Sequence, residues 1–356
     1  MNILIVKLSA LGDVTHTLPA LTALRRAYPE ACIDWLVEEV SAPIVEGHAA
    51  LDRLLVWSRR RFTGALKSGR LLEAGRILFG FVRDLRGKRY DLVLDFQALM
   101  KSGVWVFLAR GRRKVGFGRG MDHMEGSWVF LNERVPSVSM EVHALDRGLK
   151  LLEGVGIGDG KVVYDLAISS GARERVDDLV GKEGEDKRPL VAMHPVTRWR
   201  TKQWTEEGFA EVAKGLLARG YRVVFSGAPQ DKGVLDLIEK HAGMPLKRTD
   251  GKLDLKGLAA LFERADVVVS TDTGPMHIAV AVGTPVVALF GPTSPNRTGP
   301  HGEGNIVLQG GVGCSPCFSK VCRTPMGEPM GCMGRIRPGE VVKAVEAQLR
   351  RRGVGV

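Results

Sequence analysis

Residues 3–13 read Ile-Leu-Ile-Val-Lys-Leu-Ser-Ala-Leu-Gly-Asp, and this stretch decides the fold of the first half of the chain. Its apolar run, residues 3–6, predicts a strand that is buried on both faces. A short loop follows and leads near Asp13 into a helical pattern that ends at Tyr28. A buried strand, a loop and a helix in this order begin a β-α-β unit, so the sequence predicts an α/β domain built on a parallel sheet.

The same alternation continues along the chain in two series. We expect the helix after residue 205 to have Thr205 as its N-cap and Gly220 as its C-cap. The predicted strands cover residues 33–37, 54–57, 91–95, 190–194, 222–226, 267–270 and 286–290, and the predicted helices cover residues 71–85, 100–109, 205–219, 232–242, 255–265, 273–282 and 338–352.

Two series predict two Rossmann-like domains that face each other across a ligand-binding cleft. We place the first domain at residues 1–170 and the second at residues 171–337. A last helix within residues 338–356 could pack back on the first domain.

Composition narrows the class of partner. The 356 residues carry a formal net charge of +11, which favours nucleic acid, phosphorylated small molecules or an anionic membrane face. Aromatic residues make up 6% of the chain and no nucleic-acid-binding motif is present, so we expect no nucleic-acid partner. There is no signal peptide and no apolar run of about 18 residues, and we therefore expect a cytoplasmic protein.

The loop after the first predicted strand is the first candidate site. Gly12 allows a ligand to approach the backbone closely. Asp13 stands at the start of a helix, where it could cap the helix or act as a general base. The loop has neither the GxGxxG nor the Walker A spacing, which disfavours a dinucleotide or a P-loop nucleotide.

Residues 270–277, Ser-Thr-Asp-Thr-Gly-Pro-Met-His, form the second candidate site. Thr273 and Gly274 open a predicted helix after a buried strand, and a helix N-terminus of small residues suits a phosphate. Asp272 fits such a site if it binds a sugar hydroxyl or orients the loop. His277 lies one turn beyond Thr273, and the alternative is a capped helix with a half-buried histidine.

Two more loops in the second half carry candidate donor contacts. Thr197 and Lys202 could offer a hydroxyl and a positive charge to a diphosphate, although a solvated loop lysine is the plainer interpretation of Lys202. Asp231 could accept a hydrogen bond from a ribose hydroxyl, or it could cap the next helix.

Four of the five cysteines fall in one short segment: Cys314, Cys317, Cys322 and Cys332. Their spacing is compatible with a bound zinc ion, with disulfides or with a reduced structural loop. A zinc ion held by four thiolates would be structural, because it leaves no open coordination position.

Together these motifs resemble glycosyltransferase family 9, the lipopolysaccharide heptosyltransferases, over nearly the whole chain. The most specific pieces are residues 6–21, 34–39, 90–97, 272–277 and 291–293. The resemblance implies a GT-B fold and inverting transfer of heptose from ADP-heptose without a catalytic metal. The N-terminal pieces resemble type I members, which add the first heptose to Kdo of the inner core. The cysteine segment is similar to that of type II-like members, which leaves another core acceptor as the alternative.

The resemblance also implies roles for individual residues. Asp13 matches the proposed base and Lys202 matches the lysine that supports the diphosphate. The implied donor contacts are Thr197, Asp231, Asp272, Thr273, Gly274 and His277, and the implied acceptor contacts are Gly12, Arg59, Arg60, Arg61 and Arg119. The acceptor would be an anionic glycolipid at the cytoplasmic face of the inner membrane. A non-catalytic nucleotide- or glycolipid-binding protein is the rival from another class, and the oligomeric state stays open.

Overall fold

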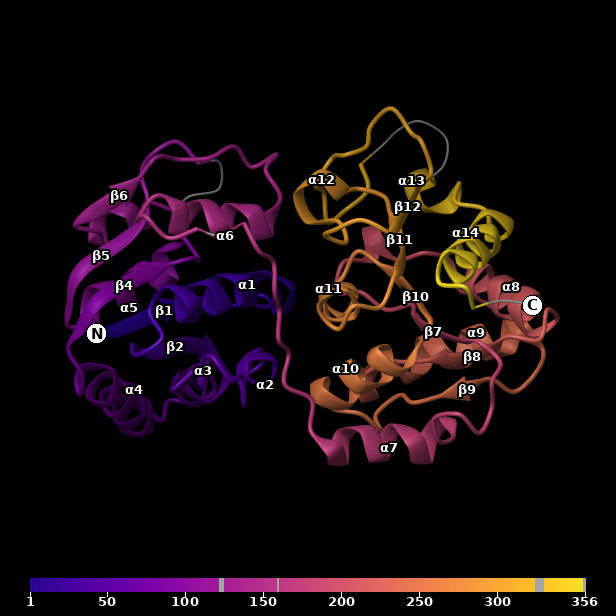
Figure 1. Ribbon diagram of the computed structural model, residues 1–356, viewed down its shortest axis with the longest axis horizontal. Helices are drawn as coiled ribbons and strands as arrows, with labels where there is room; N and C mark the ends of the chain where they lie inside the picture. Colours follow the sequence, from indigo (N-terminus) through magenta and orange to yellow (C-terminus); the bar gives the residue numbers. More distant parts are fainter. Residues whose placement is uncertain (122–124, 159, 324–329, 355–356) are drawn as a thin grey trace. The chain divides into compact units, whose positions relative to one another are not determined.

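The computed structural model describes residues 1–121, 125–158, 160–323 and 330–354. The chain divides into two compact units, Met1–Ala167 and Ile168–Val356 (Figure 1). The expected domain boundary at residue 170 lies close to this division. Each unit holds a six-stranded sheet with helices packed on it, so the predicted α/β class is confirmed.

The sheet of the first unit has the strand order β3-β2-β1-β4-β5-β6, and all of its strand pairs are parallel. Its strands are β1 (Asn2–Val6), β2 (Cys32–Glu38), β3 (Arg53–Trp57), β4 (Tyr90–Asp95), β5 (Gly111–Phe117) and β6 (Glu133–Val135). Its helices are α1 (Leu11–Ala27), α2 (Ala42–Val45), α3 (Arg59–Lys67), α4 (Leu71–Arg86), α5 (Met100–Leu108), η1 (Ser127–Phe130) and α6 (Ala144–Glu153).

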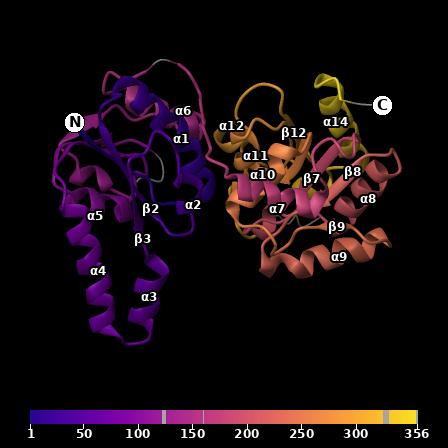
Figure 2. The same ribbon diagram turned by 60° about the horizontal axis from the view of Figure 1, so that its bottom comes forward.

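The sequence predicted the apolar strands of this sheet but not β5 or β6. Strand β5 contains Arg112, Arg113 and Lys114 in a row, so it lacks the apolar run by which buried strands are recognised. Helix α3 was missed for a similar reason, because it opens with three arginines. In Figure 2, α3 and α4 form a helical hairpin that extends away from the sheet of this unit.

The second unit repeats this plan with the order β12-β11-β10-β7-β8-β9, again with parallel pairs. Its strands are β7 (Leu190–His194), β8 (Arg222–Phe225), β9 (Lys247–Arg248), β10 (Val267–Thr271), β11 (Val286–Phe290) and β12 (Ile306–Gln309). Its helices are α7 (Ser170–Val180), η2 (Arg200–Lys202), α8 (Glu206–Leu217), η3 (Pro229–Asp231), α9 (Lys232–Ala242), α10 (Leu255–Arg264), α11 (Gly274–Ala281), α12 (Pro295–Thr298), α13 (Gly331–Gly334) and α14 (Pro338–Arg351).

The two ends of α8 test the predicted caps. Thr205 is the N-cap, and its hydroxyl accepts the backbone N–H of Gly208 at 3.0 Å, so this prediction is confirmed. The predicted C-cap is wrong, because Ala218 takes that position. Gly220 lies beyond it with φ +79°, a left-handed conformation that lets Tyr221 N–H return to the carbonyl of Leu216.

Helix α14, which the sequence predicts as a separate segment within residues 338–356, is part of the core of the second unit. Its buried Val341, Val345 and Leu349 pack with the apolar residues of that core. The helix contacts α8 and the strands β10 to β12. At its end, Arg352 donates a hydrogen bond to the carbonyl of Asp266 at 3.0 Å.

In both sheets the strand order reverses beside the first strand, between β1 and β4 and between β7 and β10. Ligands of such sheets bind outside the carboxyl ends of the strands at this switch point. Each unit therefore offers one preferred edge for a ligand. Within the described part of the chain, no helix has both the length and the apolar character needed to cross a bilayer.

Candidate functional site

A pocket of about 210 Å³ opens at the carboxyl ends of β1, β4 and β5 in the first unit. It therefore lies at the switch point of that sheet. Its lining comes from the loop after β1, the start of α1, the segment after β4, the end of β5 with the chain after it, and α6 with the chain before it: Lys7, Asp13, His16, Thr17, Phe96, Gln97, Ala98, Leu99, Phe117, Met121, Met140, Ala144, Arg147 and Gly148.

Asp13 lies in this lining and also caps its own helix. Its Oδ2 accepts the backbone N–H of Ala10 at 3.2 Å, which satisfies one donor at the start of α1. A carboxylate has two oxygens with about four acceptor positions, so one cap bond leaves capacity for a substrate hydroxyl. The two interpretations of Asp13 from the sequence are therefore compatible with each other.

Two cations in the same lining were not predicted from the sequence. Lys7 Nζ donates to the carbonyl of Phe96 at 3.1 Å. Burial lowers the pKa of Lys7, and the nearby Asp13 carboxylate opposes that shift. Arg147 of α6 donates from Nη1 to the carbonyls of Met140 and Val142 at 2.9 and 2.8 Å. A lysine directly after a buried strand was the available signal for Lys7, whereas Arg147 belongs to no motif.

Hydrogen bonds hold the loop before Asp13 against the residues that follow β4. Gln97 Oε1 accepts the backbone N–H groups of Leu8 and Ser9, both at 3.1 Å. Asp95 accepts in turn from the backbone N–H of Gln97 at 3.0 Å, and burial raises the pKa of Asp95 to about 6. These contacts fix the path of the chain between β1 and α1.

The predicted acceptor-side arginines lie elsewhere in the first unit. Arg59 and Arg61 form ion pairs of 3.6 Å with Glu38 and Glu73. Arg119 stacks over the ring of Trp128 at 4.2 Å. In this unit none of Gly12, Arg59, Arg60, Arg61 and Arg119 is among the residues that line the pocket described above. Their role as acceptor contacts stays a prediction.

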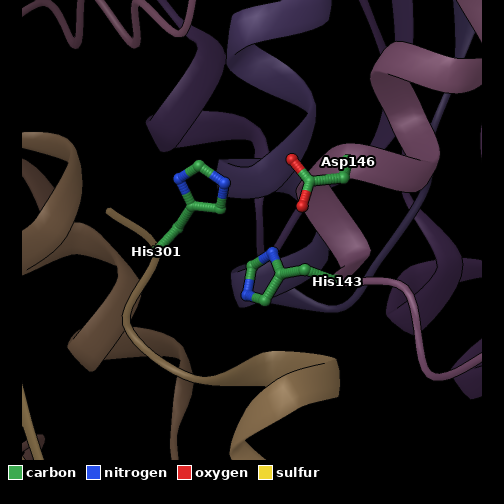
Figure 3. Close-up of side chains that lie close together, drawn as sticks. All are labelled: His143, Asp146 and His301. Atoms are coloured by element: carbon green, nitrogen blue, oxygen red, sulfur yellow. The ribbon is translucent and has the colours of Figure 1, made fainter. Parts of the chain in front are cut away.

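Helix α6 brings two titratable side chains to its first turn. His143 is the N-cap, and its Nδ1 accepts the backbone N–H of Leu145 at 3.2 Å. Its ring lies edge-on to His16, with 5.0 Å between the ring centroids. Asp146 follows in the same turn (Figure 3). His301, also drawn there, belongs to the second unit.

The second unit has its own pocket, of about 410 Å³, at the carboxyl ends of β7, β8 and β10. This is the switch point of the second sheet. Three predicted donor contacts, Thr197, Asp231 and Thr273, lie in its lining. Four other predicted residues, Lys202, Asp272, Gly274 and His277, are not part of that lining.

Asp231 repeats the arrangement of Asp13. It is the last residue of η3, and its Oδ2 accepts the backbone N–H of Ala228 at 2.8 Å. The carboxylate caps the turn and lines the pocket at the same time. The predicted cap of the next helix is wrong, because Asp231 is the N-cap residue of α9 but its side chain makes no cap hydrogen bond there. The oxygen that does not bond to Ala228 is available to a ribose hydroxyl.

Lys202 and Asp272 form a buried ion pair. Lys202 Nζ lies 2.6 Å from Asp272 Oδ2, and the two side chains are 16% and 5% exposed. Thr293 donates from Oγ1 to the same carboxylate oxygen at 2.5 Å. Lys202 also lies over the ring of Trp199 at 4.6 Å. The plainer interpretation of Lys202 as a solvated loop lysine is therefore wrong, and Asp272 holds that lysine in place.

Helix α11 starts one residue later than predicted. Thr273 is its N-cap in an extended conformation, and its side chain makes no cap hydrogen bond with the described residues. Gly274 follows as the first helical residue and Pro275, which has no N–H, as the second. His277 is buried within the helix, at 5% exposure, rather than half-buried.

His194, at the end of β7, lines the pocket of the second unit without having been predicted as a site residue. Burial lowers its pKa to about 4, and its Nδ1 shares a 3.0 Å hydrogen bond with the hydroxyl of Ser226. The imidazole is therefore neutral near pH 7. A positive charge for an anionic ligand must come from another residue, such as the half-buried Lys202.

The four clustered cysteines lie in a third place. Cys314, Cys317, Cys322 and Cys332 line a pocket of about 640 Å³ in the second unit. None of the four forms a disulfide in this structure, so the disulfide interpretation is not realised here.

The family of the chain follows from comparison with known proteins. The sequence profile of glycosyltransferase family 9 (heptosyltransferase) matches residues 78–326, which is more than half of the chain. The chain belongs to glycosyltransferase family 9. It is a glycosyltransferase, and the predicted GT-B class of two Rossmann-like domains is confirmed by its similarity to solved family 9 heptosyltransferases.

Individual family 9 relatives match over nearly their whole length. Lipopolysaccharide heptosyltransferase 1 of Pseudomonas aeruginosa is 32% identical, and the match covers 98% of each chain. The same enzyme of Escherichia coli K12 is 32% identical over 87% of this chain and 93% of its own. The structure of the E. coli heptosyltransferase WaaC with ADP superimposes with a TM-score of 0.76 at 26% identity, covering 98% of this chain and 100% of WaaC. The predicted resemblance to type I members is confirmed.

Proposed function

We propose that this family 9 glycosyltransferase moves L-glycero-D-manno-heptose from ADP-heptose to the Kdo of the lipopolysaccharide inner core, with inversion at the anomeric carbon. The observation that carries the proposal is the full-length similarity to heptosyltransferase 1 combined with the buried Lys202–Asp272 pair. A lysine held at the switch edge of a Rossmann-like sheet suits the diphosphate of a nucleotide-sugar.

The second unit would bind the donor. Asp231 would accept a ribose hydroxyl with the oxygen that its cap bond leaves available. Thr197 and Thr273 would donate to the diphosphate from the pocket lining. Lys202 would stabilise the negative charge that grows on the departing diphosphate, which is the role a metal ion fills in other transferases. Gly274 and His277 would shape the helix start behind these contacts.

The first unit would bind the acceptor and supply the base. Asp13 would take the proton of the attacking Kdo hydroxyl as the new bond to the anomeric carbon forms and the bond to the diphosphate breaks. The products would be the heptosylated acceptor and ADP. Lys7 and Arg147 lie in the same lining and would attract the Kdo carboxylates. Gly12, Arg59, Arg60, Arg61 and Arg119 remain the proposed contacts for the rest of the anionic glycolipid.

The donor can be tested without the acceptor. Isothermal titration with ADP, UDP and GDP should give the tightest binding for ADP. Equal affinities for all three nucleotides would contradict the assignment of ADP-heptose. A second acceptor, of the kind used by heptosyltransferase II, is the alternative, and it would be recognised by transfer to a heptosylated core but not to Kdo₂-lipid A.

We further propose that the α3–α4 hairpin holds the enzyme at an anionic bilayer. Phe81 on the inner face of α4 packs against Trp57 and Trp105, with ring centroids 5.1 and 4.9 Å apart. The outer face carries Leu72 and Phe79, which are 81% and 72% exposed. Large apolar side chains this exposed are typical of a helix face that enters a membrane interface.

The charge of that outer face fits a negatively charged surface. The exposed residues Leu72, Arg76, Phe79 and Arg83 are spaced by four, three and four positions, which places them on one face of α4. An arginine near an anionic membrane contributes about 1 kcal/mol to binding. The apolar side chains of this face could enter the headgroup region while the two arginines bind anionic headgroups.

Sedimentation with vesicles tests the membrane proposal. The Arg76→Glu/Arg83→Glu variant should lose binding to phosphatidylglycerol-containing vesicles. The variant Lys240→Glu/Lys247→Glu makes the same charge change on exposed lysines of the second unit and should bind as the wild type does. Equal loss in both variants would mean that net charge alone drives binding. Oligomerisation abolished by Leu72→Ser/Phe79→Ser, with vesicle binding intact, would assign the face to a second copy of the chain.

A further inference from the structure

The four clustered cysteines line one pocket although they come from separate segments. Cys314, Cys317 and Cys322 lie in the loop after β12, and Cys332 lies in α13. All four cysteines line the same pocket of about 640 Å³.

The separation of these sulfurs limits the kind of metal centre that they could bind. No three of the four sulfurs, all of them in described parts of the chain, lie within 4.8 Å of one another. A single zinc ion with bonds of about 2.3 Å would require separations of roughly 3.8 Å. The loop would therefore close inward around one ion, or the pocket would hold a wider cluster. Arg323 and Arg335 also line the pocket, and their charges would favour the thiolate forms.

We propose that Cys314, Cys317, Cys322 and Cys332 bind a thiophilic metal centre, a zinc ion or an iron–sulfur cluster, and that this centre fixes the loop that supports Lys202. Soft thiolate ligands select zinc, copper(I) or iron–sulfur clusters over magnesium or calcium. Binding would release the protons of the four thiols. With all four ligand positions filled by the protein, the centre would be structural rather than catalytic.

The loop touches the segment of Lys202 on one side. Ser319, between Cys317 and Cys322, accepts the hydroxyl hydrogen of Thr201 through its carbonyl at 2.8 Å. The next residue, Lys320, places its Nζ 5.1 Å from the ring centroid of Trp199. The ammonium of Lys202 lies over the same ring at 4.6 Å. The loop therefore packs on η2 at the residues that flank the lysine.

On its other side, the same loop contacts the segment that carries Thr293, the residue whose hydroxyl donates to Asp272. The backbone N–H groups of Cys317 and Phe318 both donate to the carbonyl of Pro292, at 3.0 and 2.7 Å. Thr293, the next residue, donates to the Asp272 carboxylate. Both members of the Lys202–Asp272 pair thus rest on contacts with a loop that has three of the four cysteines.

Metal content tests the site without reference to transfer activity. The reduced wild-type protein, reconstituted separately with Zn²⁺ and with iron plus sulfide, should retain one centre per chain after desalting. Cys314→Ser/Cys317→Ser and Cys332→Ser should lose it. Cys32→Ser is the matched control, because Cys32 lies in β2 of the first unit and its sulfur accepts from Lys88, as a serine can.

The two arms also identify the centre. Zinc retained with no sulfide requirement indicates a single ion, whereas iron retained with acid-labile sulfide and a visible absorption band indicates a cluster. No uptake in either arm would overturn the proposal. Retention that is unchanged in the Cys332→Ser variant would overturn it as well, as would a pair of disulfides in protein purified without oxygen.

The positioning role rests on the proposed donor site and is tested by ADP binding alone. Removal of the metal should weaken ADP binding, and it should add little to the effect of Lys202→Met, because both changes disturb the same contact. If metal removal leaves the affinity for ADP unchanged, the positioning role is wrong although the site stands. If ADP does not bind to the wild type, the proposed function fails and the metal measurements are unaffected.

Discussion

Lys202 Nζ lies 2.6 Å from Oδ2 of Asp272, and Thr293 donates to that same oxygen. This pair joins the loop after β7 to the loop after β10, the two central strands of the second sheet. A buried ammonium that already has an anionic partner is held in one place before a ligand arrives. We expect the diphosphate of the donor to share this ammonium with Asp272.

Replacing Lys202 with methionine should weaken ADP binding by roughly 10- to 100-fold, because a hydrogen bond to a charged group contributes about 1.5–3 kcal/mol. Turnover should fall as well, since the same charge stabilises the leaving group. Titration calorimetry measures the first effect and initial rates the second. Lys320→Met is the control, because Lys320 stacks on the same Trp199 ring without contacting Asp272. If both variants weaken ADP binding equally, the effect comes from the loss of one positive charge in this region and not from the position of Lys202.

Replacing Asp272 with asparagine should destabilise the second unit, because it leaves the Lys202 ammonium buried without its anion. Removing one partner of a buried pair costs about 3–5 kcal/mol, and this pair, with one side chain 16% exposed, should lie at the low end. Saturating ADP should recover part of the loss by supplying a new anion. Urea unfolding with and without ADP makes the measurement. A variant as stable as the wild type would show that the pair is not formed in solution.

Replacing Asp13 with asparagine should lower turnover by about 10²-fold or more, because the amide cannot accept the proton of the attacking hydroxyl. The asparagine oxygen can still accept the Ala10 N–H, so the helix cap should survive. Asp91→Asn is the matched control, because Asp91 also accepts a backbone N–H, that of Asn2 at 2.8 Å, but lies at the opposite end of the sheet. Normal turnover for Asp13→Asn would reduce its role to the cap.

The buried His194 predicts a pH dependence of stability. Its folded pKa of about 4 lies below the ordinary 6.5, so the unfolded chain binds the proton more tightly. The free energy of unfolding contributed by this group is present above pH 6.5 and is lost as the pH falls towards 4, by on the order of 3 kcal/mol. His194→Gln, which can still bond to Ser226, should lose less stability across that range. Identical slopes for variant and wild type would contradict the assignment.

The sequence was sufficient for the apolar framework and for the segments that carry the site. Strands such as β1 and β10 contain uninterrupted apolar runs, Ile-Leu-Ile-Val and Val-Val-Val, which are typical of a sheet covered on both faces. Strand β5 escaped prediction because Arg112, Arg113 and Lys114 hide that signal. A strand beside the sheet edge can expose such residues and still pair through its backbone.

Pairings between distant loops could not be read from the sequence. From the sequence, Asp13 and Asp231 could each be a helix cap or a functional group, since a carboxylate at the third position of a helix suits either role. In the structure, each carboxylate lines a pocket and also accepts a backbone N–H at the start of its own helical turn. The contact between Lys202 and Asp272 depends on β7 and β10 being neighbours, which is a property of topology rather than of local pattern. The position of Arg147 in the first pocket likewise depends on the topology of the first unit rather than on a local pattern.

The most direct measurement is a mass spectrum of Kdo₂-lipid A after incubation with ADP-heptose and the enzyme. The account predicts a mass increase of one heptose with the wild type, and a strongly reduced increase with Asp13→Asn and with Lys202→Met under the same conditions. An acceptor that remains unmodified while the enzyme binds ADP tightly would contradict the proposed reaction.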